Sequence, residues 1–228
     1  LELHIEQGPV LEREGVPIGV VTAIAAPCRG RVTLVGSADH AGATLMHERY
    51  DALCGAAEVV LGVERICAAP DLVDTVGTVG FLAVSPNMVN VIPGRVDLQV
   101  EVRSTRQGFL DRVRDQVTRT VHGVAERRRL EVSMEWDTIE EPVPIPERMQ
   151  RHIQQACDEL EVRWMSLPSR ASHDAARIAS VTPIGMVFVP SRDGKSHTPE
   201  EWTEFEDITR GVAVLGRAWM RLDEMEEG

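Results

Sequence analysis

The sequence predicts a mixed α/β protein in which a ferredoxin-like α+β domain is inserted into a partial α/β domain. Residues 29–140 read in the order strand, helix, strand, strand, helix, strand, which is the order of the split β-α-β unit. The proline-rich stretch EEPVPIP (140–146) follows and has the composition of a linker. Strands and helices alternate on both sides of this segment. We therefore predict one domain from residues 1–27 and 141–228, and an inserted domain from residues 28–140.

Hydrophobic periodicity predicts the elements of the first part of the chain. LELHIEQ (1–7) alternates apolar and polar residues, as a half-buried strand does. Residues 18–27 form a continuous apolar run, which is typical of a buried strand, and residues 29–38 alternate again. Residues 47–68 carry apolar side chains at helical spacing. Residues 74–85 are rich in β-branched side chains and predict a strand.

The later elements follow from the same patterns. After a turn at Pro93-Gly94, residues 90–104 place valine and leucine on one face of a strand and polar residues on the other. Residues 108–129 form an amphipathic helix, and residues 130–141 form a strand. The remaining predicted elements are a helix at 147–161, strands at 162–166 and 183–190, and a terminal helix at about 201–223.

Composition limits the function classes. The 228 residues carry a net charge of -12, which argues against nucleic acid and anionic membrane surfaces as partners. No stretch approaches the roughly 18 apolar residues of a membrane span. The cysteines form no CxxC pair and favour free thiols, so we expect a cytoplasmic protein. Because Leu1 lies within an apparent strand, we expect this chain to be the later part of a longer protein.

Two histidines lie where ligands gather in α/β sheets. His4 is near the end of the first strand, and His197 follows the strand at 183–190. Imidazole nitrogens suit borderline divalent metals, although each histidine alone is more often structural. TPEE (198–201) has the pattern of a capping box, which predicts a helix that begins at Pro199 and holds His197 in place.

Four other residues are ambiguous from the residues alone. His40 lies in a strand–helix loop, Asn90 precedes a turn, and Arg103 is on the polar face of a strand. Each has an ordinary structural reading: a loop residue, a turn residue and a solvated charge. His173, at the start of a short predicted helix, either faces a cleft or caps that helix.

Several strings together resemble one enzyme family. ELHIEQGPVLE, HAGATLMHERYDAL, NVIPGRVDLQVEVRS, SHDAARIA and GMVFVPSRDGKSHTPEEWT occur in the order found in M20-type metallo-amidohydrolases. The resemblance extends over essentially the whole chain and is closest to the N-carbamoyl-L-amino-acid hydrolase, allantoate amidohydrolase and β-ureidopropionase branch. It implies a catalytic α/β domain with two divalent metal ions (zinc, manganese, cobalt or nickel) and an inserted lid that forms a homodimer.

The resemblance also implies roles for individual residues. His4 and His197 would each bind one metal ion, and His40 would reach the partner's active site and stabilise the oxyanion. The residues assigned to substrate binding are Gln7, Asn90, Arg103 and His173. The implied reaction cleaves the C–N bond of a ureido compound and releases ammonia.

The family's other metal ligands and its general-base glutamate precede the segment that matches this chain. We therefore expect the 228 residues to be inactive alone. Leu45, Arg170 and Ser172 replace residues that are usual in the family, so substrate preference is open. The alternatives are a non-catalytic dimerisation module and an M20 dipeptidase.

Overall fold

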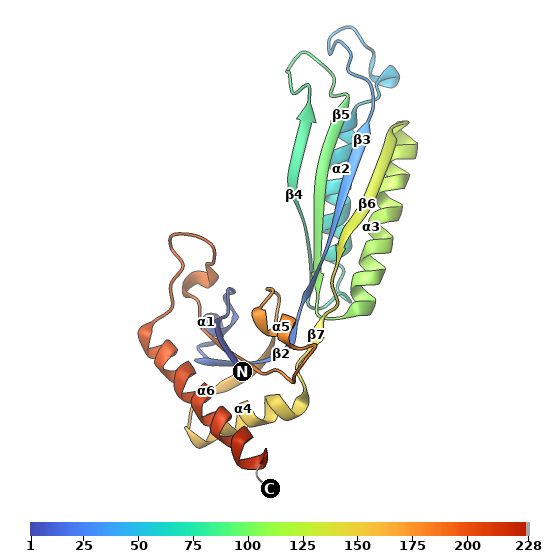
Figure 1. Cartoon of the computed structure of the whole chain (residues 1–228). Coiled ribbons are helices and arrows are strands. Elements are labelled where there is room, and N and C mark those ends of the chain that lie inside the picture. The colour runs from blue at the N-terminus through green and yellow to red at the C-terminus, as the bar shows by residue number, and fades with distance from the viewer. Residues whose placement is uncertain (227–228) are drawn as a thin grey trace. The chain divides into compact units, whose positions relative to one another are not determined.

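A computed structural model describes residues 1–226 of the chain. Contacts divide the chain into two compact units (Figure 1). Unit 1 comprises Leu1–Ala25 and the chain from Pro142 onward, and unit 2 comprises Ala26–Glu141. Over the described residues, no helix combines the length and the apolar composition needed to cross a bilayer.

Unit 1 is a mixed sheet with helices on both faces. Its elements are β1 (Glu2–Ile5), α1 (Val10–Glu14), β2 (Ile18–Ile24), β7 (Val143–Pro144), α4 (Glu147–Glu159), β8 (Trp164–Ser169), α5 (Asp174–Ile178), β9 (Met186–Val189), a 3₁₀ turn at Arg192–Gly194, and α6 (Phe205–Glu226). The strand order is β1-β9-β2-β7, and β8 also pairs with β2. β1 runs parallel to β9, whereas β2 runs antiparallel to β9.

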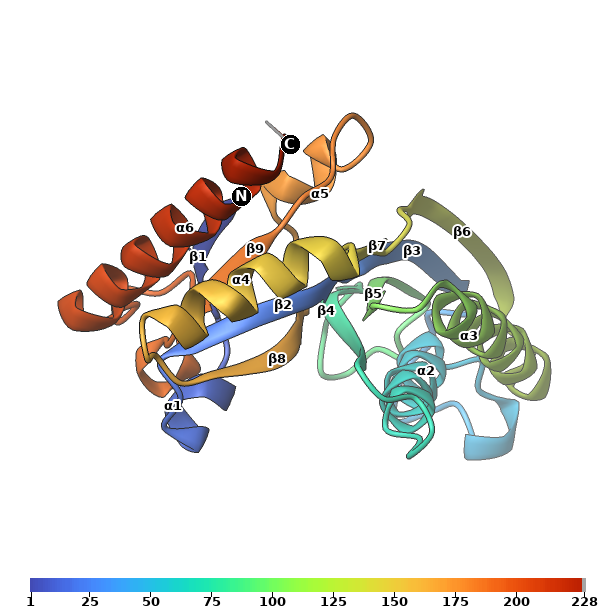
Figure 2. The ribbon, with the colours of Figure 1, turned by 90° about the horizontal axis from the view of Figure 1, so that it is seen from below.

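The alternation of β1 separates its core side chains from its polar ones. Leu3 and Ile5 pack into a cluster with residues of α4 and α6, such as Ile153 and Val214. Helices α4 and α6 lie side by side over this face of the sheet (Figure 2). Because successive side chains of a strand point to opposite faces, Glu2 and His4 lie on the other face.

Unit 2 has the predicted order of strands and helices. Its elements are β3 (Ala26–Val35), a 3₁₀ turn at Met46–Glu48, α2 (Ala52–Cys67), β4 (Thr75–Ser85), β5 (Arg95–Ser104), α3 (Gln107–Arg128) and β6 (Glu131–Ile139). The sheet is antiparallel with order β4-β5-β3-β6. The valines and leucines of β3 and β5 pack with buried residues of α2 and α3, which explains the alternation seen in the sequence.

Two predicted helix starts differ from the observed ones. Helix α2 begins at Ala52 rather than at residue 47, because the Asp51 carboxylate caps it by accepting from the N–H groups of Leu53 and Cys54. The terminal helix, predicted from about residue 201 with a capping pattern that put its start at Pro199, instead begins at Phe205. The physical reason lies in the loop that contains His197, because the carboxylate of the capping pattern bonds backwards to that loop.

Candidate metal and substrate site

Parallel pairing brings His4 and the His197 loop to the same edge of the unit 1 sheet. His4 is in register with Phe188, and Ile5 with Val189, so both strands end together. Beyond this pair, the Gln7 N–H donates to Ser191 Oγ at 3.0 Å. The segments after β1 and β9 therefore run alongside each other.

The ring of His4 is oriented by two contacts. Its Nδ1 donates to the carbonyl oxygen of Ile5 at 2.8 Å, which places the proton on Nδ1 and leaves Nε2 with a lone pair. The His173 ring meets it edge-on, with centroids 4.6 Å apart and planes at 71°. A neutral imidazole whose other nitrogen is hydrogen-bonded is the usual form of a metal-binding histidine.

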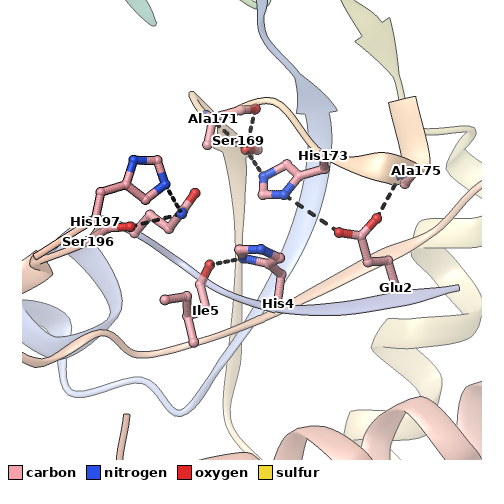
Figure 3. Close-up of polar contacts among 10 residues, drawn as sticks. Glu2, His4, Ile5, Ser169, Ala171, His173, Ala175, Ser196 and His197 are labelled. Atoms are coloured by element: carbon pink, nitrogen blue, oxygen red, sulfur yellow. Dashed lines mark hydrogen bonds and ion pairs between the residues drawn. The ribbon is translucent and has the colours of Figure 1, made fainter. Parts of the chain in front are cut away.

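His173 is buried beside His4. Its side chain is 0% exposed, although we assigned it to substrate binding. Its Nε2 lies 2.6 Å from Ser169 Oγ, and its Nδ1 lies 3.6 Å from Glu2 Oε1 (Figure 3). Burial, with a smaller effect of His4, lowers the pKa of His173 to about 4, so the ring is neutral at pH 7. Both ring nitrogens face protein groups, Ser169 and Glu2. The substrate role of His173 stays a prediction.

Glu2 completes this cluster, and our sequence analysis missed it. Its Oε2 accepts from the Ala175 N–H at 2.7 Å, which ties β1 to the first turn of α5. One potential ligand atom from each of Glu2, His4 and His173 lies within 4.8 Å of the others. The only local signal was the spacing of Glu2 and His4, which puts both on one face of a strand.

Gln7 and His197 form a second group of polar side chains. Gln7 Nε2 donates to Ser196 Oγ at 2.9 Å and lies 3.4 Å from His197 Nε2. Both Gln7 and His197 adopt positive φ, 58° and 59°, which is uncommon for non-glycine residues and concentrates at functional sites.

Glu201 holds the His197 loop. Its Oε2 accepts from the His197 N–H at 2.9 Å and from Ser196 Oγ at 2.8 Å. These two hydrogen bonds lower the pKa of Glu201 below its ordinary value. The carboxylate that we predicted to begin a helix therefore fixes the histidine directly.

Glu6, which lies beside His4 in the sequence, has a structural task. Its two carboxylate oxygens accept from the N–H groups of Val10 at 2.9 Å and Leu11 at 2.7 Å. Glu6 thus caps α1, a position where helix N–H groups need acceptors and a negative charge is favoured.

His40 lies in unit 2, in an exposed loop beside Asn90. His40 forms a β-bridge with Val91, and the Ala41 N–H donates to the Asn90 carbonyl oxygen at 3.0 Å. The Gly42 N–H donates to His40 Nδ1 at 3.0 Å, which places the ring proton on Nε2. A Cβ at position 42 would lie 3.2 Å from the ring, so glycine allows this close approach. The ring can donate a hydrogen bond through Nε2.

Arg103 and Asn90 lie near opposite ends of β5. Arg103 pairs with Pro27 and Val76, while Asn90 precedes Arg95, where the strand begins. The eight residue steps from Arg95 to Arg103 span about 26 Å. The two side chains of one chain therefore cannot contact the same small carboxylate.

The Arg103 guanidinium is held by Glu101. Its Nε donates to Glu101 Oε1 at 2.6 Å, and Arg29 Nε donates to Oε2 of the same carboxylate at 2.5 Å. Burial raises the pKa of Glu101, but the two arginine hydrogen bonds outweigh it and hold that pKa below its ordinary value. Glu101 stays ionised and orients the Arg103 side chain.

The mixed α/β fold and this cluster of histidines and carboxylates agree with membership of a family of hydrolases. The family model described as "Peptidase family M20/M25/M40" matches residues 1–221, and the chain belongs to this family. The resemblance stated from the sequence is thereby confirmed.

Relatives with a named activity include amidohydrolases. The chain is 42% identical over 98% of its length to an N-carbamoyl-L-amino-acid amidohydrolase of Paenarthrobacter aurescens and covers 54% of that protein. It is 39% identical over 97% of its length to a ureidoglycolate hydrolase of Arabidopsis thaliana, covering 47%. A solved hydantoinase/carbamoylase-family amidase from Burkholderia multivorans is 38% identical with a TM-score of 0.89 over 95% of this chain and 52% of its own. The chain thus spans about half the length of these relatives.

Proposed function

We propose that this chain is part of a metal-dependent amidohydrolase that cleaves the C–N bond of a ureido compound and releases ammonia. The candidate substrates are an N-carbamoyl-L-amino acid and allantoate. The observation that carries the proposal is that His4 lies near the end of β1, while Gln7 and His197 meet in the segments that follow the parallel strands β1 and β9. The names of the amidohydrolase relatives support this substrate class.

His4 and His197 are the proposed ligands of two divalent ions. The fit rests on the His4 ring, whose Nδ1 bonds to a backbone carbonyl so that Nε2 presents a lone pair. A divalent ion bound there would lower the pKa of a bound water and supply hydroxide near neutral pH. The Glu201 carboxylate keeps the His197 backbone in place beside Gln7, whose amide we assign to the substrate.

Unit 2 would supply the groups that bind the rest of the substrate. The Arg103 guanidinium is a planar fork that matches a carboxylate in bidentate fashion. His40, with its proton on Nε2, can donate to the oxygen on which negative charge develops. This arrangement favours substrates that carry a carboxylate next to the ureido group.

We propose that the working protein is a homodimer in which two copies build each site. The separation of Asn90 and Arg103 along β5 supports it, because both can contact one substrate carboxylate only if they come from different chains. His40 lies beside Asn90 and would enter the site with it. In this arrangement unit 2 acts as both lid and dimerisation domain.

The proposal is tested by assaying the complete product of the source gene. Ammonia release is measured from N-carbamoyl-L-amino acids and from allantoate, with and without a chelator, for the wild type and His197→Ala. We expect chelator-sensitive activity that His197→Ala abolishes, and no activity from the 228 residues alone. A protein that dimerises but hydrolyses none of these substrates with any divalent metal would instead be a non-catalytic dimerisation module.

A further inference from the structure

A chain of hydrogen bonds runs from Gln7, whose amide we assigned to the substrate, through Ser196 to the Glu201 carboxylate. We propose that Ser196 is a positioning residue that fixes which end of the Gln7 amide faces the substrate. The inference rests on the proposed function for the identity of the substrate, and on the structure for the orientation of the amide. It gives Ser196 a role in the preference for ureido compounds.

The direction of the hydrogen bonds in this chain is set at the Glu201 end. Because the pKa of Glu201 lies below its ordinary value, its side chain is a carboxylate at pH 7 and can only accept. Ser196 Oγ lies 2.8 Å from Glu201 Oε2, so the single hydroxyl proton of Ser196 lies between these two oxygens. With that proton elsewhere, oxygen lone pairs would face each other across this distance without a donor.

Ser196 therefore accepts from Gln7 and cannot donate to it. A hydroxyl has one proton, which here goes to Glu201, and its lone pairs remain to accept. The Gln7 side-chain atom that lies 2.9 Å from Ser196 Oγ must then be the amide nitrogen Nε2 and not the oxygen. The two ends of an amide have nearly the same shape, so the hydrogen-bond partners decide its orientation. Ser196 thus selects one of the two orientations of the Gln7 amide.

The backbone of Gln7 is held as well as its amide nitrogen. The Gln7 N–H donates to Oγ of Ser191, a residue that is 0% exposed. Gln7 also keeps a positive φ of 58°, which a non-glycine residue adopts only where its surroundings require it. Among the residues that the structure describes, none donates a hydrogen bond to Gln7 Oε1. The amide oxygen is therefore the acceptor that remains for a substrate.

An amide oxygen presented to the substrate matches a ureido group better than an acyl group. The carbamoyl end of a ureido compound is an amine that donates hydrogen bonds, whereas an acetyl group has a methyl in its place. Gln7 Oε1 can accept from that amine, but a flipped amide would set its own N–H groups against it and leave donors unpaired. A site built to bond a substrate N–H discriminates against the analogue that lacks it. Ser196 therefore favours the ureido compound over its N-acyl analogue.

The competing explanation is that Ser196 only holds the loop. Glu201 also accepts from the His197 N–H, so the loop keeps this hydrogen bond when the Ser196 hydroxyl is removed. A purely structural Ser196 would affect all substrates alike, whereas an orienting Ser196 affects only those whose amine meets Gln7. Ser196→Ala removes the hydroxyl and Ser196→Thr restores it. Thr198→Ala is the matched control, because it removes from the same loop a hydroxyl that forms no hydrogen bond among the described residues.

The test compares a ureido compound that the wild type cleaves with its N-acetyl analogue, using the complete product of the source gene. kcat/KM is measured for both compounds, and the N-acetyl analogue is measured as a competitive inhibitor where it is not cleaved. We expect Ser196→Ala to lower the preference for the ureido compound at least about threefold, which is the effect of losing one hydrogen bond. Ser196→Thr should restore the preference, and Thr198→Ala should keep it.

Crystal structures of the complete product give a readout that does not depend on hydrolysis. We expect Ser196 to contact both Glu201 and Gln7 in the wild type, and the Gln7 side chain to lose its single position in Ser196→Ala. The inference is overturned if Gln7 keeps its position without the hydroxyl, or if Ser196→Ala changes both compounds equally. A wild type that cleaves no ureido compound contradicts the proposed function, and the crystal structures then still decide whether Ser196 orients the amide.

Discussion

If Asn90 and Arg103 of different chains share one substrate, two inactive variants should restore each other's activity. The perturbation is Asn90→Ala in one copy of the complete gene product and Arg103→Ala in the other. Each variant alone lacks one of the two groups at every site. A mixed dimer has one site with both mutations and one site with neither.

The size of the rescue follows from the symmetry of the dimer. Random association of equal amounts gives half mixed dimers, and each has one intact site, so we expect about 25% of wild-type activity. Asn90 precedes β5 and Arg103 lies near its far end, about 26 Å from Arg95, which argues against a shared site within one chain. The assay co-expresses the two variants with different affinity tags, purifies the mixture, and measures ammonia release against each variant alone.

The control is a double variant with Asn90→Ala and Arg103→Ala in the same chain, co-expressed with wild type. Here the mixed dimer has one mutation in each site, so activity should come from wild-type dimers only and again be about 25%. A mixture of the single variants that is no more active than its components would refute the reasoning. It would show that Asn90 and Arg103 do not reach one substrate from different chains.

Three further predictions concern stability in urea. Gly36→Ala places a Cβ 1.8 Å from a backbone carbonyl oxygen and should destabilise unit 2 by about 1–3 kcal/mol. Gly123→Ala, within α3, brings a Cβ no closer than 3.5 Å to a side-chain atom and should stabilise unit 2 by about 0.5–1 kcal/mol. Burial, together with nearby arginines, lowers the pKa of His152 in the folded chain. As the pH drops below about 6.5, the unfolded chain therefore takes up a proton at His152 before the folded chain does, and stability should fall. His152→Gln should flatten this pH dependence. Ile153→Ala, at 0% exposure, should cost about 2–5 kcal/mol, and Leu160→Ala, at 40%, less than about 0.5 kcal/mol. Equal effects within either matched pair, or a pH dependence unchanged by His152→Gln, would contradict these assignments.

Local pattern predicted most elements because each pattern reflects burial on one face. The apolar spacing of α3 and the alternation of β5 both face the unit 2 core, so their periods are visible in the chain. The same reasoning failed at residues 198–201. The pattern there is that of a helix cap, but the Glu201 carboxylate bonds to the preceding His197 N–H, and α6 begins at Phe205.

Part of the candidate site also followed from sequence. Their places after strands made His4 and His197 candidate residues, and the family resemblance implied their metal roles, before their strands were known to pair. That pairing is now observed between β1 and β9, while the metal roles remain proposals. Glu2 was missed because nothing local distinguishes it from an ordinary polar residue on a strand.

The sequence by itself determined the elements, their order and the family, because these depend on residues close together in the chain and on strings with fixed internal spacing. Only the tertiary structure decided which distant side chains meet. Glu2 and His173 lie 3.6 Å apart although 171 positions separate them, whereas Asn90 and Arg103, only 13 positions apart, lie near opposite ends of one strand. The physical reason is that strand pairing, not separation along the chain, sets the distance between side chains in a folded sheet.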